Sequence, residues 1–380
     1  MRDGDPAGGK LRRVRLLAYT DAGGVGGAEI SLGNLLSELR TGSAAQREDL
    51  EIVVLGVDET VVARVAPPGV EAVVAPVRRH PGLLARLRPD VVHANLPTPW
   101  AAAPGLSAAL ALPRTRVLAV QQLPLRTVEL PVWLRTRALL RRLDAHVAVG
   151  EQSARRMEDF YALGRGSVRS IPNFVPDLAG APPSRGSHAS TGRPLVVGSL
   201  GRLDRMKGYD VLIEALARVP DVCLVVLGEG KERAALEAQA RDLGVADRVD
   251  LPGWDPEPRA RMADWDVFCL PSRSEGFPLS VVEAMLAGLP VVATRVGSVA
   301  EAVDDATTGL LVDKDDVDGL TTALAALTDP RRRQAMGRAG RERAARRFTV
   351  DRMAAAYLEL YDELTARPRR PRLRPGAEKP

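Results

Sequence analysis

Short apolar runs alternate with helical patterns along this chain, and the alternation stops once and then resumes. Strands that alternate with helices at this spacing build parallel sheets with helices on both faces. The chain has 380 residues, more than one ordinary core holds, because domains contain roughly 100 to 200 residues. The pattern therefore predicts an α/β fold of two tandem, Rossmann-like, doubly wound domains.

Seven strands are expected in the first half and six in the second, each bounded by turn residues. Those of the first half are VRLLAYT (14–20), EIVVLGV (51–57), EAVVAPV (71–77), DVVHAN (90–95), RVLAVQQ (116–122), AHVAVG (145–150) and VRSIPN (168–173). Those of the second half are PLVVGSLG (194–201), VCLVVLG (222–228), VDLPGW (249–254), DVFCLPS (266–272), PVVATRV (290–296) and GLLV (309–312). Helices of the second half are expected near 207–218, 231–243, 278–287 and 316–328. One helix of the first half is indicated by Ala28, Leu32, Leu35, Leu36 and Leu39, which recur on one helical face.

Proline, glycine and serine dominate the stretch between the halves, where no hydrophobic period survives. We predict a linker over 178–193, between an N-terminal domain (1–177) and a C-terminal domain (194–349). A helix is expected over 350–366. Residues 367–380 are rich in proline and arginine without apolar periodicity, so we predict a disordered basic tail there.

The composition excludes several classes of protein. Hydrophobic residues make up 45% and charged residues 27% of the chain, a balance typical of a soluble globular protein. No run approaches the ~18 apolar residues of a membrane span, and the N-terminus lacks the apolar core of a signal peptide. Cys223 and Cys269 lie inside apolar runs, which indicates buried thiols and not a disulfide framework. We therefore predict a cytoplasmic protein.

No metal site is expected. The four histidines and two cysteines show no spacing of three or four residues that would suit a metal ion. Two Asp-x-Asp sequences, at 264–266 and 313–315, have the form found in some metal-dependent enzymes. We assign the first to a helix-to-strand turn and the second to a helix cap.

Open parallel sheets bind ligands at the carboxyl ends of their strands, so the residues after each strand are the functional candidates. After the first strand, a glycine-rich loop that includes Gly24 and Gly26 leads into a helix. Glycine allows close approach of the backbone, and a helix N-terminus attracts anions. The loop matches neither GxGxxG nor GxxxxGK[ST], and a flexible turn before a helix is the alternative interpretation.

Arg202 and Lys207 follow the first strand of the second half, in GRLDRMKG (201–208). A guanidinium grips phosphate oxygens in pairs, and an ammonium acts as a mobile point charge. Two cations in one short loop are also a common solvated surface pair, so this loop alone leaves both interpretations open.

Two carboxylates follow the expected strand 266–272. Glu275 opens the sequence EGFPLSVVE, in which Pro278 suits the first turn of a helix and Glu283 lies more than one turn further along. Carboxylates accept hydrogen bonds from paired hydroxyls, as sugars and ribose present them. The alternatives are a helix N-terminal charge for Glu275 and a solvated position for Glu283. The apolar neighbours of Glu283 argue against full solvation.

Five motifs in this order together resemble the retaining, nucleotide-sugar-dependent glycosyltransferases of family 4, which have the GT-B fold. They are GGVGGAE (23–29), IPNFVP (171–176), GRLDRMKG (201–208), LVVLGEG (224–230) and EGFPLSVVE (275–283). The resemblance spans residues 12–365. It implies two domains that face each other across a cleft, an acceptor-side first domain and a donor-binding second domain, and a 350–366 helix that crosses back to the first.

The resemblance also implies roles for individual residues. Arg202 and Lys207 would hold the donor pyrophosphate, Glu275 would contact hydroxyls of the transferred sugar, and Glu283 would accept the ribose hydroxyls. The other implied residues are Gly276, Phe277 and Leu279 beside the phosphates, Gly253 at the base-binding edge, and Gly24 and Gly26 near the donor phosphates and the acceptor. The cations and a helix N-terminus would stabilise the departing diphosphate without a metal ion or other cofactor.

The chain departs from the family pattern in its first domain. The family often carries a histidine near the end of the strand that reads RVLAVQQ here, and this chain has Gln121 and Gln122. Glutamine can hydrogen-bond a sugar hydroxyl but cannot act as an acid or base. His93 ends the preceding strand, where an acceptor-facing role and a core or capping role both fit. Phe174 replaces the glycine that often follows the asparagine of IPNFVP.

We therefore expect a retaining, metal-independent hexosyltransferase that uses a nucleotide sugar, with UDP as the expected nucleotide. The acceptor class is left open between a small molecule, a glycan and a lipid-linked compound, and no nucleic-acid partner is expected. A nucleotide-sugar epimerase and a non-catalytic nucleotide-sugar-binding protein are the alternatives. The stretch WLRTRALLRRL (133–143) allows a weak peripheral membrane contact, although a core-packed, solvated helix also explains it.

Overall fold

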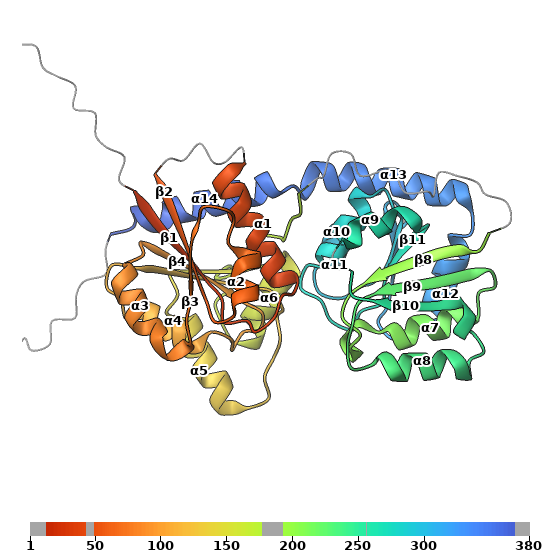
Figure 1. The fold of residues 1–380 in the computed structure, drawn as a ribbon, viewed down its shortest axis with the longest axis horizontal. Coiled ribbons are helices and arrows are strands. Elements are labelled where there is room, and N and C mark those ends of the chain that lie inside the picture. Colours follow the sequence, from red (N-terminus) through yellow and green to blue (C-terminus); the bar gives the residue numbers. More distant parts are fainter. Residues whose placement is uncertain (1–12, 43–48, 177–192, 256, 369–380) are drawn as a thin grey trace, which may run out of the picture. The chain divides into compact units, whose positions relative to one another are not determined.

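The computed structural model describes residues 13–42, 49–176, 193–255 and 257–368 (Figure 1). The expected linker, except for residue 193, and the expected tail beyond residue 368 lie outside these ranges. By their contacts the residues form two units, one within Met1–Gln121, Arg126–Val147 and Ala354–Pro380 and the other within Gln122–Leu125 and Ala148–Met353. The domain boundaries given above stay predictions.

The first sheet has seven parallel strands in the order β3-β2-β1-β4-β5-β6-β7. The strands are β1 (Val14–Tyr19), β2 (Leu50–Gly56), β3 (Glu71–Val74), β4 (Val91–Leu96), β5 (Arg116–Gln121), β6 (Ala145–Ala148) and β7 (Arg169–Ser170). Each expected strand of this half is present, and β7 is the most shortened. The strand order reverses between β1 and β4, so the sheet is doubly wound as predicted.

Helices cover both faces of this sheet. They are α1 (Gly27–Thr41), α2 (Glu59–Val65), α3 (His80–Leu87), α4 (Ala103–Leu110), α5 (Leu130–Leu140), α6 (Glu151–Phe160) and α14 (Val350–Ala366), with a 3₁₀ turn, η2 (Val77–Arg79). Alternation along β4 separates the faces. Ala94 belongs to the core that includes Leu84 of α3 and Leu106 of α4, while His93 contacts Tyr361 of α14 on the other face.

The second sheet has six parallel strands in the order β10-β9-β8-β11-β12-β13. The strands are β8 (Leu195–Leu200), β9 (Val222–Leu227), β10 (Val249–Gly253), β11 (Val267–Leu270), β12 (Val291–Thr294) and β13 (Gly309–Val312), again in agreement with the expected runs. The strand order reverses between β8 and β11, which are hydrogen-bonded neighbours. The loops that leave β8 and β11 therefore start side by side at one edge of the sheet.

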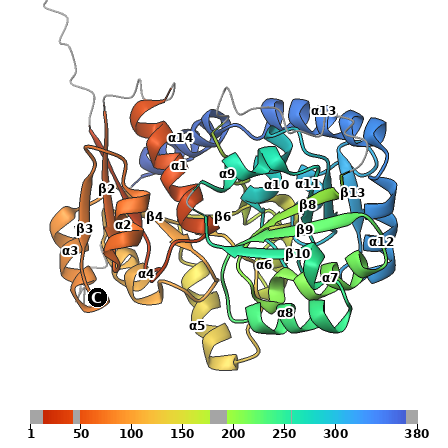
Figure 2. The same cartoon turned by 45° about the vertical axis from the view of Figure 1, so that its right-hand side comes forward.

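The helices of the second half are α7 (Tyr209–Ala217), α8 (Arg233–Asp242), α9 (Pro258–Arg261), α10 (Leu279–Leu286), α11 (Val299–Ala302), α12 (Val317–Ala326) and α13 (Pro330–Arg347). Three 3₁₀ turns join them: η4 (Arg205–Lys207), η5 (Ala246–Arg248) and η6 (Met262–Asp264). Figure 2 shows α7, α8 and α12 on one face of this sheet and α10 and α13 on the other. The expected fold is thus confirmed: two tandem, doubly wound parallel sheets.

One long helix, α13, was not predicted by the sequence pattern. Its sequence, PRRRQAMGRAGRERAARR, offers few apolar residues for a hydrophobic period. The buried stripe instead consists of Arg333, Met336, Gly337, Gly340 and Ala344. A Cβ on Gly337 would lie 2.1 Å from the carbonyl oxygen of Gly288, so glycine lets this helix pack closely on the end of α10.

Candidate active site

A part-buried ion pair lies where the loops after β8 and β11 meet. The Lys207 ammonium stands 2.7 Å from Oε1 of Glu275, and the Ser272 hydroxyl donates to the same oxygen at 2.6 Å. Glu275 is only 8% exposed. No hydrogen bond from the described residues reaches Oε2 of Glu275, so one carboxylate oxygen is anchored and the other is left for hydroxyl donors.

The backbone of the Glu275 loop is clamped on two sides. A Cβ on Gly276 would lie 1.9 Å from the carbonyl oxygen of Gln122, so this position requires glycine. On the other side, Ser298 donates its N–H to the Gly276 carbonyl at 2.8 Å, and Gly297 adopts φ 53° against the Glu275 carbonyl. The position of the carboxylate is therefore set by close backbone packing.

Arg273, which sequence reasoning missed, holds the turn that carries Lys207. Its guanidinium donates to both oxygens of Asp210, at 2.8 and 2.7 Å, and to the Arg205 carbonyl in η4 at 2.7 Å. The hydrogen bonds to Asp210 and Asp315 raise the pKa of Arg273 above its ordinary value, so this cation stays charged. Arg202 differs, because its side chain is 82% exposed and touches only Asp204, at 3.3 Å, among the described ion pairs.

Glu283 is held by an arginine that the sequence did not single out. Arg259 of α9 places Nε and Nη2 each 2.9 Å from Oε1 of Glu283, whose side chain is 11% exposed. Its remaining nitrogen, Nη1, donates to the Pro176 carbonyl at 3.2 Å. The carboxylate expected to meet ribose is therefore oriented by a cation, with Oε1 used and Oε2 available to hydroxyls.

The carboxyl end of β10 presents an exposed aromatic ring. Gly253 has φ 98°, in the region that favours glycine, and its carbonyl accepts from Gly228 N–H at 2.8 Å. The next residue, Trp254, is 74% exposed. An exposed indole beside a sheet edge is a platform on which a nucleobase can stack. The motif VDLPGW was noted in the sequence, but the exposure of Trp254 was not.

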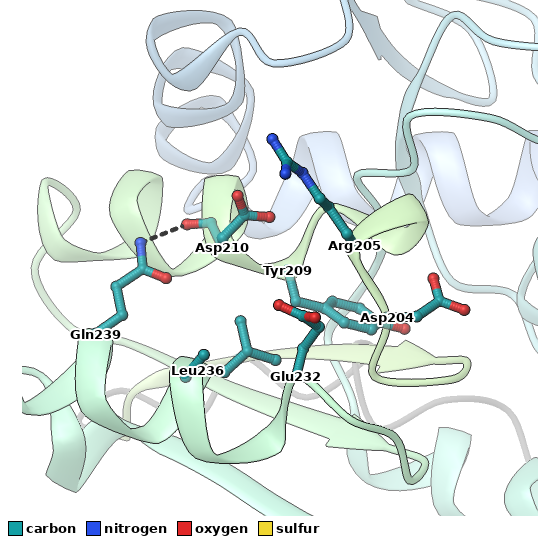
Figure 3. A pocket seen from close by; sticks show the side chains of 8 residues that line it. Asp204, Arg205, Tyr209, Asp210, Glu232, Leu236 and Gln239 are labelled. Atoms are coloured by element: carbon teal, nitrogen blue, oxygen red, sulfur yellow. Dashed lines mark hydrogen bonds between the residues drawn. The ribbon is translucent and has the colours of Figure 1, made fainter.

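A cavity of about 230 Å³ lies between η4, α7 and α8 (Figure 3). It is lined by Asp204, Arg205, Tyr209, Asp210, Glu232, Ala235, Leu236 and Gln239. Neither Lys207 nor Glu275 lines it. Three carboxylates in its wall repel a diphosphate, so the Lys207–Glu275 pair, and not this cavity, is the candidate anion site.

Two family models match this chain. The model described as Glycosyltransferase Family 4 matches residues 25–177, and the model described as Glycosyl transferases group 1 matches residues 182–343. The two matches follow the order of the two sheets. The second includes Lys207, Glu275 and Glu283, and the first begins at Val25, so it includes Gly26 of the glycine-rich loop and not Gly24.

Curated relatives extend this finding. A GDP-mannose-dependent α-(1-6)-phosphatidylinositol monomannoside mannosyltransferase of Mycobacterium tuberculosis is 34% identical over 71% of this chain and 77% of its own length. The chain belongs to glycosyltransferase family 4. A D-inositol 3-phosphate glycosyltransferase of Xylanimonas cellulosilytica is 42% identical over 44% of this chain and 42% of its own length. In its matches to three curated relatives, this one among them, the chain spans about half of their length.

Solved structures share the fold of this family 4 chain. A sucrose-phosphate synthase from Thermosynechococcus elongatus has a TM-score of 0.77 at 22% identity and covers 93% of this chain and 100% of its own. HepE from Anabaena, in complex with UDP and glucose, has a TM-score of 0.78 at 21% identity and covers 92% and 100%. The GT-B fold expected from the motifs is confirmed.

The glycine-rich loop of this family 4 chain is fixed at its ends and open in its middle. Asp21 accepts the Ala102 N–H at 2.8 Å, and Glu29 accepts the Gly26 N–H at 3.0 Å. A Cβ on Gly24 would meet nothing within 4 Å. Burial raises the pKa of Glu29, whose Oε1 has no hydrogen-bond partner among the described residues.

The two glutamines at the family's histidine position have different surroundings. Gln122 lies against Gly276, and its Oε1 accepts from Asn173 at 2.8 Å. Gln121 is fully buried, and neither of its amide atoms has a partner among the described residues. Of the two, Gln122 is the one at the Glu275 loop.

His93 lies in the core of the first unit. It is 2% exposed, its Nδ1 is 2.7 Å from the Tyr361 hydroxyl, and its ring centroid lies 5.0 Å from that of Tyr357. Burial lowers the pKa of His93 to about 3. Of the two roles that the sequence left open, the geometry favours the core role.

Phe277 and Leu279 contribute little side-chain surface to the loop. Phe277 is 4% exposed, with its ring centroid 5.5 Å from that of Phe348, and Leu279 is 8% exposed. Their predicted contribution is through backbone N–H groups. Leu279 opens the first turn of α10, where the N–H groups lack partners within the helix, and Phe277 lies two residues before it.

No group of three or more His, Cys, Asp or Glu among the described residues could hold a metal ion. Asp266 of the first Asp-x-Asp sequence accepts from Arg193 at 2.7 Å and from Val196 N–H at 2.9 Å. Asp315 of the second accepts from Arg273, and its neighbour Asp316 caps α12. Within the same residues, no helix is both long and apolar enough to cross a bilayer.

Proposed function

We propose that this family 4 chain transfers a hexose from a nucleoside diphosphate sugar to an acceptor, with retention of the anomeric configuration and without a metal ion. The observation that carries the proposal is the part-buried Lys207–Glu275 pair at the junction of the loops after β8 and β11. A cation and an anchored carboxylate at one sheet edge suit a ligand that joins a diphosphate to a polyhydroxyl ring.

The leaving diphosphate gains negative charge as the glycosidic bond breaks. Lys207, Arg202 and the N-terminal turn of α10 are the groups proposed to stabilise that charge. Arg202 is exposed and Lys207 is already placed by η4, so we expect Lys207 to bind first and Arg202 to close over the phosphates. In the retaining route the departing phosphate oxygen takes the acceptor proton, so no side chain has to act as a nucleophile.

The two carboxylates are assigned to different hydroxyls. Oε2 of Glu275 would accept from the transferred sugar, while Oε1 stays with Ser272 and the Lys207 ammonium turns toward the phosphates. Oε2 of Glu283 would accept from ribose, while Arg259 holds Oε1. Arg259 is thus a positioning residue for Glu283.

The donor nucleotide is proposed to stack on Trp254 beside Gly253. We keep UDP as the first candidate. GDP is the second, because two relatives are named as GDP-mannose-dependent enzymes. The acceptor is proposed to bind at the loop around Gly24 and Gly26. Relatives named for phosphatidylinositol mannosides, inositol phosphate and lipopolysaccharide core make phosphorylated polyols and lipid-linked glycans the classes to test. A cytoplasmic location stays part of the proposal.

The test is a thermal-shift panel of UDP- and GDP-sugars with the full chain. A donor that binds the folded state must raise the midpoint by mass action. Lys207→Ala and Glu283→Ala should abolish the shift, and Lys231→Ala, an exposed lysine outside the pair, should keep it. Glu275→Ala should lower turnover and spare nucleotide binding. A full shift in Lys207→Ala would falsify the assigned phosphate site.

Product analysis separates the alternative functions. A transferase releases free nucleoside diphosphate when an acceptor is present, an epimerase converts the donor into its epimer, and a binding protein leaves the donor intact. Activity that persists in excess EDTA is expected from the proposed mechanism. Loss of activity in EDTA, restored by Mg²⁺ or Mn²⁺, would contradict the metal-independent part.

A further inference from the structure

Three bulky aliphatic side chains stand out into solvent within seven residues of the first unit. Val128 is 97% exposed, Leu130 is 64% exposed and Leu134 is 53% exposed. They are three of the eight large hydrophobic residues that are exposed in the described chain. Single exposed aliphatics are ordinary, but a local group of them marks a surface that has a partner.

The group continues along one stripe of α5. Leu130, Leu134 and Ala138 are four residues apart and all exposed, so they lie above one another on the helix. Thr136 and Leu140 are buried on the opposite side. Figures 1 and 2 both show α5, in yellow, at the margin of the first unit. The stripe therefore faces away from the core of this unit.

The rim of the stripe is basic. Arg126, Arg135, Arg141 and Arg142 are exposed, and Glu129 is the only exposed acidic residue between Arg126 and Arg142. With the half-buried Arg137, residues 126–142 contain five arginines and one glutamate, a net charge of +4. On the same helix, the half-buried Arg137 lies 5.6 Å from the ring centroid of the half-buried Trp133. Leucine and tryptophan beside arginine are typical of helices that lie in the interface of an anionic bilayer.

We propose that the Arg126–Arg142 surface docks the chain on an anionic phospholipid bilayer. Val128, Leu130 and Leu134 enter the headgroup and acyl boundary, and the arginines contact lipid phosphates. Nucleic acid matches the charge but offers nothing for three aliphatic side chains to bury in. An acidic protein partner is the competing occupant. This inference does not rest on the donor site, because all its residues belong to the first unit.

The position of this surface gives docking a consequence for the acceptor. Val128 and Leu130 lie in and just after the loop that leaves the carboxyl end of β5. In open parallel sheets ligands bind at that edge, where the Gly24 loop also starts after β1. Docking by this loop brings the ligand-binding edge of the first sheet toward the lipid surface.

The experiment is vesicle flotation of the full chain at low salt. We expect binding to vesicles of 70% phosphatidylcholine and 30% phosphatidylglycerol, and none to pure phosphatidylcholine. The double variant Arg135→Glu and Arg141→Glu should lose at least about tenfold in bound fraction, given roughly 1 kcal/mol for each basic residue at an anionic surface. The triple variant Val128→Asp, Leu130→Asp and Leu134→Asp should also lose at least about tenfold, because it is costly to take a charged group out of water. Added salt should weaken wild-type binding.

Matched controls separate this surface from general effects. Val74→Asp and Leu243→Asp alter exposed apolar residues elsewhere, and Arg331→Glu with Arg332→Glu reverses two exposed charges on α13. All three should bind as the wild type does.

Undiminished flotation of both α5 variants would overturn the proposal, and so would an equal loss in the α13 control. Binding to soluble polyglutamate without binding to anionic vesicles would assign the surface to an acidic protein instead. Unchanged circular dichroism of each variant keeps a loss of binding distinct from a loss of fold.

Discussion

Polar groups that are buried or half-buried are paired to different extents in the two units. In the second unit, the carboxylates of Glu275 and Glu283 each have charged partners, and Arg273 has two. In the first unit, Glu29, Gln121, Thr136 and His146 each carry buried polar atoms without a partner among the described residues, whereas in the second unit only Arg333 does. The charged groups of the candidate site in the second unit are thus already paired with one another.

The glycines show the same contrast. Gly276 is required by the protein itself, since a Cβ there would overlap the Gln122 carbonyl. At Gly24 neither packing nor a positive φ calls for glycine. Preorganised groups stabilise a transition state without reorganisation, whereas unpaired buried groups raise the free energy of the folded state until something pairs them. The first unit is therefore the one expected to change most when a ligand binds.

The largest expected effect is a selective loss of stability of the first unit in mild acid. Burial lowers the pKa of both His93 and His146 to about 3, and all described histidines lie in the first unit. Below pH 6.5 these two histidines bind protons in the unfolded chain but stay neutral in the folded chain. The free energy of unfolding of the first unit is therefore highest above pH 6.5 and falls as the pH is lowered toward 3. At pH 5 the loss is roughly 2 kcal/mol for each histidine.

Hydrogen exchange at pH 7.5 and pH 5, corrected for the intrinsic rates, measures this loss in each unit. Strands β4 and β6 should lose protection, and β8 and β11 should keep it. His146→Phe should remove about half of the pH dependence and keep or raise stability at pH 7.5, because neither ring nitrogen of His146 has a described partner. An equal loss of protection in both sheets would contradict the selective acid sensitivity of the first unit.

The second prediction sets one glycine against another. Gly276→Ala should lower the free energy of unfolding by about 3 kcal/mol, because backbone must move to admit the methyl group. Gly24→Ala should change it by less than about 0.5 kcal/mol. If the loop approaches a ligand closely, Gly24→Ala should still raise KM. Chemical denaturation and steady-state kinetics give the two readouts, and a Gly276→Ala chain as stable as the wild type would contradict the clamp.

The third prediction concerns Arg259. Arg259→Ala should weaken donor binding about tenfold while kcat changes little, because a charged hydrogen bond of roughly 1.5 kcal/mol no longer orients Glu283. Arg259→Lys should recover part of the loss. Arg261→Ala is the matched control, since its guanidinium lies 4.0 Å from Asp255 and is half exposed. Titration calorimetry measures the donor affinity of each variant. Equal losses of affinity in Arg259→Ala and Arg261→Ala would contradict the role assigned to Arg259.

The smallest expected effect separates the two neighbouring glutamines. Gln121→Leu should raise the free energy of unfolding by about 1 kcal/mol, since it removes two unpartnered buried amide atoms. Gln122→Leu should lower it by about 1 kcal/mol, because the Asn173 hydrogen bond is lost. Denaturant melts of both variants test the sign. If Gln121→Leu lowers the free energy of unfolding as much as Gln122→Leu does, then Gln121 has a hydrogen-bond partner in the folded protein. The first unit would then have fewer unpaired buried polar groups, and the difference between the units would be smaller.

Much of the fold was predictable because its signals are local. Runs such as VRLLAYT and VCLVVLG predict buried parallel strands by composition alone, and each was found. The α13 helix was missed because its buried stripe contains one large apolar residue, Met336, beside two glycines, an alanine and an arginine, so no hydrophobic period marks it. The loop that carries Lys207 and the two glutamates could be selected as candidates from the sequence, because such motifs keep their spacing along the chain.

Arg259, Arg273 and Trp254 could not be predicted in the same way. Arg259 reaches Glu283 across 24 residues and Arg273 reaches Asp210 across 63, and no repeat or spacing marks such pairs. Arginine is a common residue and is mostly exposed in folded proteins. Neither the residue type nor the neighbouring residues therefore show which arginine pairs with a carboxylate and which is solvated. The exposure of Trp254 likewise depends on how β10 ends against Glu229 and Arg233.

By itself, then, the amino-acid order determined two wound sheets, the loops at their ligand edges and the kinds of side chain in those loops, because hydrophobic period and turn chemistry act over a few residues. Which charges pair, which glycine the packing requires and which aliphatics stay in water were decided only by tertiary structure. Those outcomes depend on distances between segments that are remote in the chain, as at the switch point of the second sheet, where the loops after β8 and β11 meet.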